Sequence, residues 1–359
     1  MSKNIAFYIS DHGFGHIMRN LPVIAHILET TNAGVVLVTG ERQTNIAGEY
    51  IERYCTGNKG NIVYESCNTD FGIVVKQGTL TADVPAMERG LKAYIDSFEK
   101  RIKAAHSLFK RYNIDCVVCD IVPWALKAAK LADIPSVLMA SFTWIEIYEE
   151  LVAEEYIKPF RECFDCADKV LLYELANEPT VKRFENGIRV GFAARPFHED
   201  KVDKIRAKLT SGNKPVVFVS VGGSNSGLKD EIDVSNLPYT FAVTQGLKFK
   251  GDNVYYIAPD VDNSQDYVAA SDMCIIKAGW STVAEVALAG KPMALLSRPD
   301  VAEDRMTIDM LTKRGMAVEV GVHELENMHV VLDKIKMAEI VIPEFANDFE
   351  KIADEIINS

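Results

Sequence analysis

The sequence contains no apolar run of the roughly 18 residues that a membrane-spanning helix requires. Its first residues, MSKNIAFYISDHGFGH, lead directly into a strand-like pattern, so we expect no signal peptide and a cytoplasmic protein. Basic residues are also few: 39 Lys and Arg stand against 51 Asp and Glu, giving a net charge of −12. They form no basic block, which a general nucleic-acid binder needs for its phosphate contacts. We therefore expect neither an integral membrane segment nor a nucleic-acid partner.

Cysteine is sparse, but two of the spacings are ones that zinc sites use. The seven cysteines include the pairs Cys116–Cys119 and Cys163–Cys166, each with two residues between. The first pair lies in CVVCD (116–120), a pattern typical of a buried strand, on which residues three apart point to opposite faces. Free cysteine is a normal core residue in a reducing compartment. We therefore predict no metal site.

Strand-like apolar runs alternate with helical stretches along the chain, and its 359 residues suggest two domains. Buried strands linked by helices are typical of doubly wound α/β lobes with parallel sheets. We expect strands over 4–10, 33–40, 116–120, 135–141, 169–174, 188–192, 215–223, 253–258, 272–279 and 292–297. We expect helices over 20–28, 124–133, 281–290 and 344–358, and a long amphipathic stretch over 85–112. The predicted lobes are 1–195 and 196–342, followed by a C-terminal segment (343–359) that either caps the second lobe or crosses back to the first.

An unusual concentration of polar residues follows the first predicted strand. His12, Gly13, Gly15, His16 and Arg19 fall within eight residues. In open α/β sheets ligands bind at the carboxyl ends of the strands, where glycines let the backbone approach a ligand closely. The spacing matches neither the dinucleotide fingerprint nor the P-loop. We interpret the loop as part of a binding site, against the alternative of a tight turn with exposed histidines.

Asp120 ends a second strand and would lie on the same edge of the sheet as His16. A carboxylate that accepts one ring N–H of a histidine fixes its tautomer and stabilises the imidazolium. The competing interpretation makes Asp120 the N-cap of the next helix, which Pro123 near the helix start also fits. The sequence leaves both open.

Two glycine-containing turns follow predicted strands of the second lobe. Gly222, Gly223 and Ser224 come directly after one strand, where backbone N–H groups can meet phosphate. Gly279, Ser281, Thr282 and Glu285 follow another strand. Their structural alternative is a capping box, with Ser281 or Thr282 as the N-cap. Their functional interpretation is a helix N-terminus that binds phosphate, with Glu285 as an exposed pocket carboxylate for the ribose hydroxyls.

Together these segments resemble the GT-B glycosyltransferases, in which an acceptor lobe precedes a nucleotide-sugar lobe. The Gly-Gly-Ser loop and the Gly279–Glu285 stretch, with Gly290-Lys-Pro292, are similar to the donor site of lipid II-type GlcNAc transferases. The resemblance implies a UDP-linked donor sugar, with Glu285 on the ribose and Ser224 and the turn at 279–282 at the pyrophosphate. It also implies that His16 is the base of an inverting transferase and Asp120 its partner.

The first lobe also resembles the glycosyltransferase-like region of L-arabinokinases. The likeness rests on HGFGHIMR (12–19), DFGIVVKQGTLTADVPA (70–86) and SFTWIEIYEE (141–150), which contains Thr143 and Trp144. By this likeness Thr143 and Trp144 are expected on the acceptor side. No phosphate loop of the sugar-kinase type follows residue 300, so kinase activity is not inferred.

One departure concerns the donor sugar. Where many GT-B lobes place Asp-Gln or Gln-Gln, this chain has Glu303-Asp304, whose carboxylates would repel a uronate and favour a neutral sugar. Asp260-Val-Asp262 has the Asp-x-Asp spacing of metal-dependent transferases, but it falls in a turn-like segment, so neither a metal nor another cofactor is expected. The alternatives are a nucleotide-sugar hydrolase, in which His16 (or His12) activates water, and a non-catalytic sugar-nucleotide-binding protein.

Overall fold

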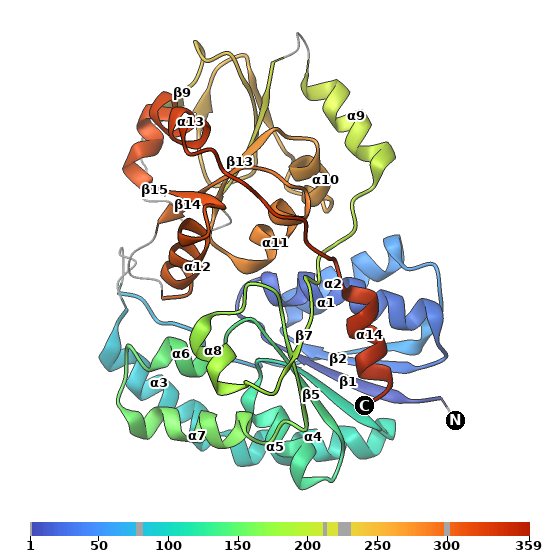
Figure 1. Ribbon diagram of the computed structural model, residues 1–359. Helices are drawn as coiled ribbons and strands as arrows, with labels where there is room; N and C mark the ends of the chain where they lie inside the picture. Colours follow the sequence, from blue (N-terminus) through green and yellow to red (C-terminus); the bar gives the residue numbers. More distant parts are fainter. Residues whose placement is uncertain (1, 77–81, 211–213, 222–230, 298–301) are drawn as a thin grey trace. The chain divides into compact units, whose positions relative to one another are not determined.

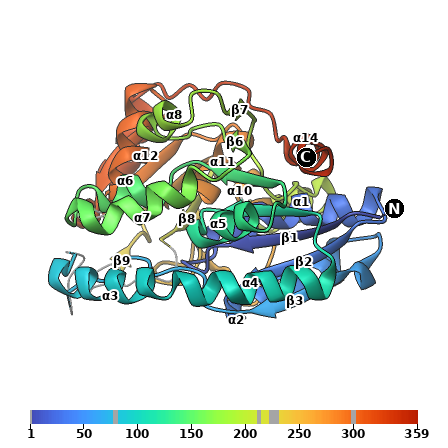
Figure 2. The same ribbon diagram turned by 90° about the horizontal axis from the view of Figure 1, so that it is seen from below.

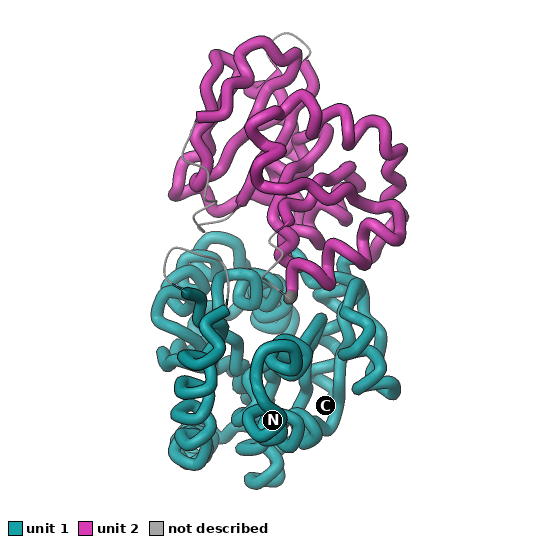
Figure 3. Tube along the Cα trace, turned by 90° about the vertical axis from the view of Figure 1, so that its left-hand side faces the viewer, with its two compact units in different colours: residues 1–194, 347–359 teal, residues 195–346 magenta. Residues whose placement is uncertain are grey.

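The computed structural model describes residues 2–76, 82–210, 214–221, 231–297 and 302–359. The chain forms two compact units, each built around its own parallel β-sheet (Figure 1, Figure 3). Unit 1 comprises residues 1–194 and 347–359, and unit 2 comprises residues 195–346. The C-terminal segment therefore belongs to unit 1, which is one of the two arrangements that the sequence left open.

Unit 1 contains a seven-stranded sheet in the order β3-β2-β1-β4-β5-β6-β7, with parallel neighbours throughout. Its strands are β1 (Asn4–Ile9), β2 (Gly34–Thr39), β3 (Ile62–Ser66), β4 (Cys116–Asp120), β5 (Ser136–Ala140), β6 (Lys169–Leu172) and β7 (Ile188–Arg189). The apolar runs predicted all of these except β3, whose side chains are mostly exposed. The strand order reverses between β1 and β4, and such a point is where open α/β sheets bind ligands.

Helices cover both faces of this sheet, with α1, α2 and α14 on one side and α4, α5 and α7 on the other (Figure 1, Figure 2). The helices are α1 (Gly15–Thr30), α2 (Glu41–Tyr54), α3 (Val84–Asp96), α4 (Phe98–Tyr112), α5 (Pro123–Leu131), α6 (Trp144–Tyr148), α7 (Glu154–Phe164), α8 (Glu178–Arg183) and α14 (Phe349–Ile357), with a short 3-10 helix η1 (Lys59–Asn61). The stretch over 85–112 is two helices, divided at Ser97. α14 packs on α1, where the rings of Phe349 and His26 meet edge-to-face.

Unit 2 repeats this plan with a six-stranded parallel sheet in the order β12-β10-β8-β13-β14-β15. Its strands are β8 (Val216–Ser220), β10 (Thr240–Val243), β12 (Val254–Tyr256), β13 (Met273–Lys277), β14 (Met293–Ser297) and β15 (Ala317–Gly321), with a separate pair, β9 (Ile232–Asp233) and β11 (Phe249–Lys250). Its helices are α9 (Glu199–Leu209), α10 (Ser264–Ala269), α11 (Trp280–Leu288), α12 (Ala302–Lys313) and α13 (Met328–Met337), with the 3-10 helix η2 (Val322–Asn327). Here the order reverses between β8 and β13, so each unit has its own ligand-binding edge. The predicted α/β fold of two parallel-sheet lobes is confirmed.

Candidate active site

The polar loop of unit 1 joins β1 to α1, and α1 begins at Gly15, five residues before the predicted start at Asn20. The earlier start places His16, Arg19 and Asn20 on the first turns of the helix, where all three side chains are buried. β1 pairs with β4 in a register that sets Ile9 beside Asp120. The loop, the helix start and the end of β4 therefore meet at one edge of the sheet.

His16 and Asp120 are in direct contact at this edge. The Nδ1 atom of His16 lies 2.8 Å from Oδ1 of Asp120. We assign the proton to Nδ1, because the carboxylate is the better acceptor, and this leaves the lone pair on Nε2. The N-cap interpretation of Asp120 is wrong: α5 begins at Pro123 with Val122 at its N-cap, and no side chain caps it.

The carboxylate of Asp120 accepts further hydrogen bonds from two neighbours on α1. Arg19 donates Nε to Oδ2 at 2.7 Å and Nη2 to Oδ1, and Asn20 donates Nδ2 to Oδ2 at 2.6 Å. Complete burial alone would raise the pKa of Asp120, but the charges and hydrogen bonds of Arg19 and His16 hold it well below its ordinary value. The lowered pKa favours the ionised form of Asp120 near neutral pH.

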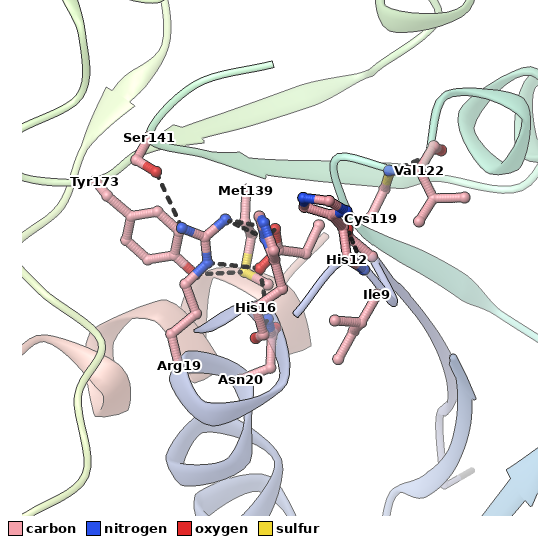
Figure 4. A network of polar contacts seen from close by, with 12 residues as sticks. Ile9, His12, His16, Arg19, Asn20, Cys119, Val122, Met139, Ser141 and Tyr173 are labelled. Carbon is pink, nitrogen blue, oxygen red and sulfur yellow. Dashed lines mark hydrogen bonds and ion pairs between the residues drawn. The ribbon is translucent and has the colours of Figure 1, made fainter. Parts of the chain in front are cut away.

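Arg19 is expected on the acceptor side, yet the structure buries it with only 2% of its surface exposed. Besides its two bonds to Asp120, it donates Nη1 to the Ser141 hydroxyl at 3.0 Å, and its guanidinium lies over the Tyr173 ring (Figure 4). Its contacts thus fix the carboxylate that holds His16. Arg19 is a positioning residue of this site.

His12 lies on the same loop but is exposed. Its ring meets the ring of Trp144 edge-to-face, with 5.3 Å between centroids. Gly13 follows in the left-handed conformation (φ +75°), which glycine adopts without strain, and its carbonyl accepts a hydrogen bond from the Gln43 amide. Of these two histidines, His16 is therefore the one that the structure shows in contact with Asp120.

Thr143 and Trp144 follow β5 and are expected on the acceptor side, but the structure buries both. Thr143 is the N-cap of α6 and exchanges hydrogen bonds with Glu146 in a capping box. Trp144 begins α6 and stacks on Tyr148. Arg183 binds Glu146 from α8 at 3.3 Å, a pairing across 37 residues that the sequence did not indicate. Trp144 faces the loop between β1 and α1, where its ring contacts the ring of His12.

In unit 2, α11 begins at the carboxyl end of β13. Gly279 occupies the N-cap position without a side-chain bond, and Ser281 and Thr282 lie in the first turn. The capping-box interpretation is therefore wrong. The turn presents backbone N–H groups and the positive end of the helix dipole, which is the arrangement that binds phosphate in other proteins.

Glu285 is buried, with 4% of its surface exposed, so the expectation of an exposed pocket carboxylate is wrong. Its Oε1 accepts two hydrogen bonds from Arg195, at 2.9 Å from Nε and 2.8 Å from Nη2. Burial raises the pKa of Glu285, and the charge of Arg195 opposes the rise. Arg195 also donates to the Asp262 carbonyl and the Ser264 hydroxyl. The hydrogen bonds that Glu285 accepts from side chains of the described residues all go to Oε1.

The other residues predicted for the donor site are placed in part. Gly222, Gly223 and Ser224 lie outside the described residues. Glu303 and Asp304 lie in the first turn of α12, and Asp304 is buried. Among the described residues no group of three or more His, Cys, Asp or Glu side chains could hold a metal ion. A bilayer-spanning helix would have to be longer and more apolar than any that the described part of the chain forms.

Comparisons with known sequences found a family model that matches most of unit 2 and curated proteins that resemble larger parts of the chain. The family model for the glycosyltransferase family 28 C-terminal domain matches residues 202–337. The chain is 25% identical to L-arabinokinase from Arabidopsis thaliana over 332 residues, which is 88% of this chain and 30% of that protein. It is 28% identical over 183 residues to the UDP-N-acetylglucosamine–N-acetylmuramyl-(pentapeptide) pyrophosphoryl-undecaprenol N-acetylglucosamine transferase of Caldanaerobacter subterraneus, covering 44% and 47% of the two chains. The chain thus spans less than half the length of both relatives.

Solved structures agree with the sequence matches. The crystal structure of CalG4, the calicheamicin glycosyltransferase, aligns with a TM-score of 0.65 and 14% identity over 99% of this chain and 97% of its own. At that identity the likeness shows the fold. The matched family and the structural neighbours are glycosyltransferases. Residues 202–337 match the glycosyltransferase family 28 C-terminal domain, and the chain as a whole has the two-lobed GT-B fold.

Proposed function

We propose that the protein transfers a neutral sugar from a UDP-linked donor to a hydroxyl group of an acceptor, with inversion at the anomeric carbon. The observation that carries this proposal is the contact of His16 with Asp120. Asp120 is held as an anion by Arg19 and Asn20, so it can orient the imidazole and stabilise the imidazolium that forms when His16 takes a proton.

In the proposed reaction, Nε2 of His16 accepts the proton of the acceptor hydroxyl. The acceptor oxygen then forms a bond to the anomeric carbon as the bond from that carbon to the β-phosphate oxygen breaks. The electron pair leaves with the nucleoside diphosphate. The turn at Gly279, with Ser281 and Thr282, can stabilise the leaving diphosphate through backbone N–H groups and the dipole of α11.

The family 28 match over residues 202–337 supports placing the donor on unit 2. We assign the ribose hydroxyls to Glu285, which Arg195 holds through Oε1. Gly222, Gly223 and Ser224 remain proposed pyrophosphate contacts. We assign the sugar hydroxyls to Glu303 and Asp304, carboxylates that favour a neutral sugar over a uronate.

The test is release of UDP from a panel of neutral UDP-sugars, with and without a mixture of hydroxylated acceptors. A transferase releases UDP in proportion to added acceptor, and NMR of the product shows the inverted anomer. Rapid and complete release without acceptor would instead indicate a hydrolase that uses the same histidine on water. UDP that raises the melting temperature in the absence of any turnover would indicate a binding protein.

A further inference from the structure

Two buried polar groups near the His12–His16 loop have no hydrogen-bond partner among the described residues. They are the carboxyl group of Asp70, both of whose oxygens are unpaired, and the indole Nε1–H of Trp144. The two residues are 5% and 2% exposed. Buried polar groups are nearly always satisfied, so two unsatisfied groups at one place indicate that a partner is missing from it.

Three aromatic side chains hold the backbone of the surrounding segment, residues 69–72. Tyr94 and Trp124 donate to the Thr69 carbonyl at 2.6 and 3.1 Å, and Tyr148 donates to the Gly72 carbonyl at 3.0 Å. These aromatic side chains come from α3, α5 and α6 and lock the backbone in place. The unpaired groups are therefore held in a rigid frame, which is how a binding site is preorganised.

This corner adjoins the proposed base. The backbone N–H of Asp70 donates to Oδ1 of Asp11 at 3.0 Å, and Asp11 immediately precedes His12. The ring of Trp144 contacts the exposed ring of His12. His12 is therefore an exposed side chain at this corner, and Gly13 follows it in the left-handed conformation.

The chemistry of the corner selects the ligand. Burial raises the pKa of Asp70 well above its ordinary value, and the carboxylates of Asp11 and Asp120 add to the rise; the polar hydrogens of Ser10 and Trp144, which lie near the carboxyl group, oppose it. A protonated carboxyl group offers one donor and one acceptor, and the indole offers a second donor. A neutral hydroxyl group matches this set. An anion would be repelled by Asp11 and Asp120.

We propose that Asp70 and Trp144 form a subsite for a hydroxyl group of the acceptor, and that the acceptor is a neutral, sugar-like polyol. The identification of this ligand with the acceptor rests on the proposed transferase function. The subsite itself requires only that a neutral polyol binds unit 1 at this corner.

The experiment titrates three probes that share one ring but differ in charge: D-glucose, D-glucosamine and D-glucuronate. Saturation-transfer difference NMR at neutral pH follows binding without donor or turnover. We expect glucose to bind at least about tenfold more tightly than the anion glucuronate, whereas glucosamine shows whether a cation is tolerated. No saturable binding of glucose, or binding of glucuronate as tight as that of glucose, would overturn the proposal.

Variants locate the binding. Asp70→Leu and Trp144→Phe should each weaken glucose about tenfold, whereas Asp70→Asn, which keeps a neutral donor and acceptor, should stay within about threefold of the wild type. Trp124→Phe is the matched control, because it removes an indole N–H that is already paired with Thr69. Thermal melts verify that each variant folds.

If both weakening variants fold and bind glucose as the wild type does, the unpaired groups hold a buried water only and the proposal fails. The two proposals fail separately. A protein that turns over UDP-sugars without binding glucose refutes the subsite, and one that binds glucose at Asp70 without turnover refutes the transferase.

Discussion

The two units each hold a buried carboxylate against a buried arginine, yet the two carboxylates differ. In unit 1, both oxygens of Asp120 accept hydrogen bonds, from Arg19, Asn20 and His16, and its pKa is lowered. In unit 2, Glu285 is bonded only through Oε1 to Arg195, and burial raises its pKa. The number of donors thus sets the direction in which the pKa of each carboxyl group moves. Both oxygens of Asp120 are bonded, whereas the bonds to Glu285 all go to one oxygen.

The largest expected effect comes from removing the proposed base. His16→Ala should slow single turnover ~10²–10⁴-fold, because no group then takes the acceptor proton. UDP affinity should be unchanged, since the nucleotide is assigned to unit 2. His12→Ala is the matched control from the same loop and should stay within about tenfold of the wild type. A wild-type rate for His16→Ala refutes the base, and a large loss confined to His12→Ala transfers the role to His12.

Neutralising Asp120 is the most direct test of the difference between the two carboxylates. Asp120→Asn leaves the guanidinium of Arg19 buried without a counter-charge, so the free energy of unfolding should fall by about 3–5 kcal/mol. Turnover should also fall, because the amide no longer supports the imidazolium. Chemical denaturation measures the first effect. A loss below about 1 kcal/mol would mean that Asp120 does not carry the charge assigned to it.

A smaller effect is expected at Glu285. Glu285→Gln keeps an oxygen for Arg195, which also retains the Asp262 carbonyl and the Ser264 hydroxyl. The fold should therefore survive, while loss of a charged hydrogen bond to ribose weakens UDP by about 1.5–3 kcal/mol. Calorimetry tests this. Unchanged UDP affinity in the folded variant would make Glu285 a structural partner of Arg195 alone.

The smallest effect is a pH dependence of opposite sign for two acids of unit 1. The pKa of Asp70 is raised, so above about pH 4 the unfolded chain ionises it before the folded chain does, and its contribution to stability falls as pH rises. The stability of Asp70→Asn relative to the wild type should therefore increase from pH 4 towards pH 7, by at most about 1.4 kcal/mol per pH unit.

Asp120 provides the contrast in the same melts. Its pKa is lowered, so its contribution to stability is present above about pH 4 and is lost as pH falls towards its folded value. The loss of stability caused by Asp120→Asn, relative to the wild type, should therefore become smaller as the pH falls. For Asp70, the contradicting result is a stability difference between Asp70→Asn and the wild type that is the same at pH 4 and at pH 7.

Much of the candidate site in unit 1 could be predicted from the sequence. A continuous apolar run such as CVVCD must be a buried parallel strand, and the carboxyl ends of parallel strands meet at one edge, which brings Asp120 to His16. The start of α1 was misplaced because Gly13 and Gly15 have the composition of a turn, although Gly15 already lies in the helix.

The parts of the site that the sequence does not predict are contacts between residues far apart in the chain. Arg195 and Glu285 are 90 residues apart, and nothing in the local pattern of either residue indicates the other. The same holds for the carboxyl of Asp70, whose isolation becomes visible only once Tyr94, Trp124 and Tyr148 are seen to donate elsewhere. Burial and pairing of charged groups are tertiary properties, so periodicity and spacing do not encode them.

In the proposed mechanism, Asp120 holds the proton of His16 on Nδ1 and leaves Nε2 free as the base. The Nδ1 atom lies 2.8 Å from Asp120 Oδ1 but also 3.0 Å from Nη2 of Arg19, a second hydrogen-bonding possibility. Long-range ¹H–¹⁵N NMR of labelled protein, with His16→Ala to assign the signals, reports which nitrogen is protonated. We predict a protonated Nδ1 and an unprotonated Nε2 in the neutral ring. A proton on Nε2, with Nδ1 accepting from Arg19, would contradict the account.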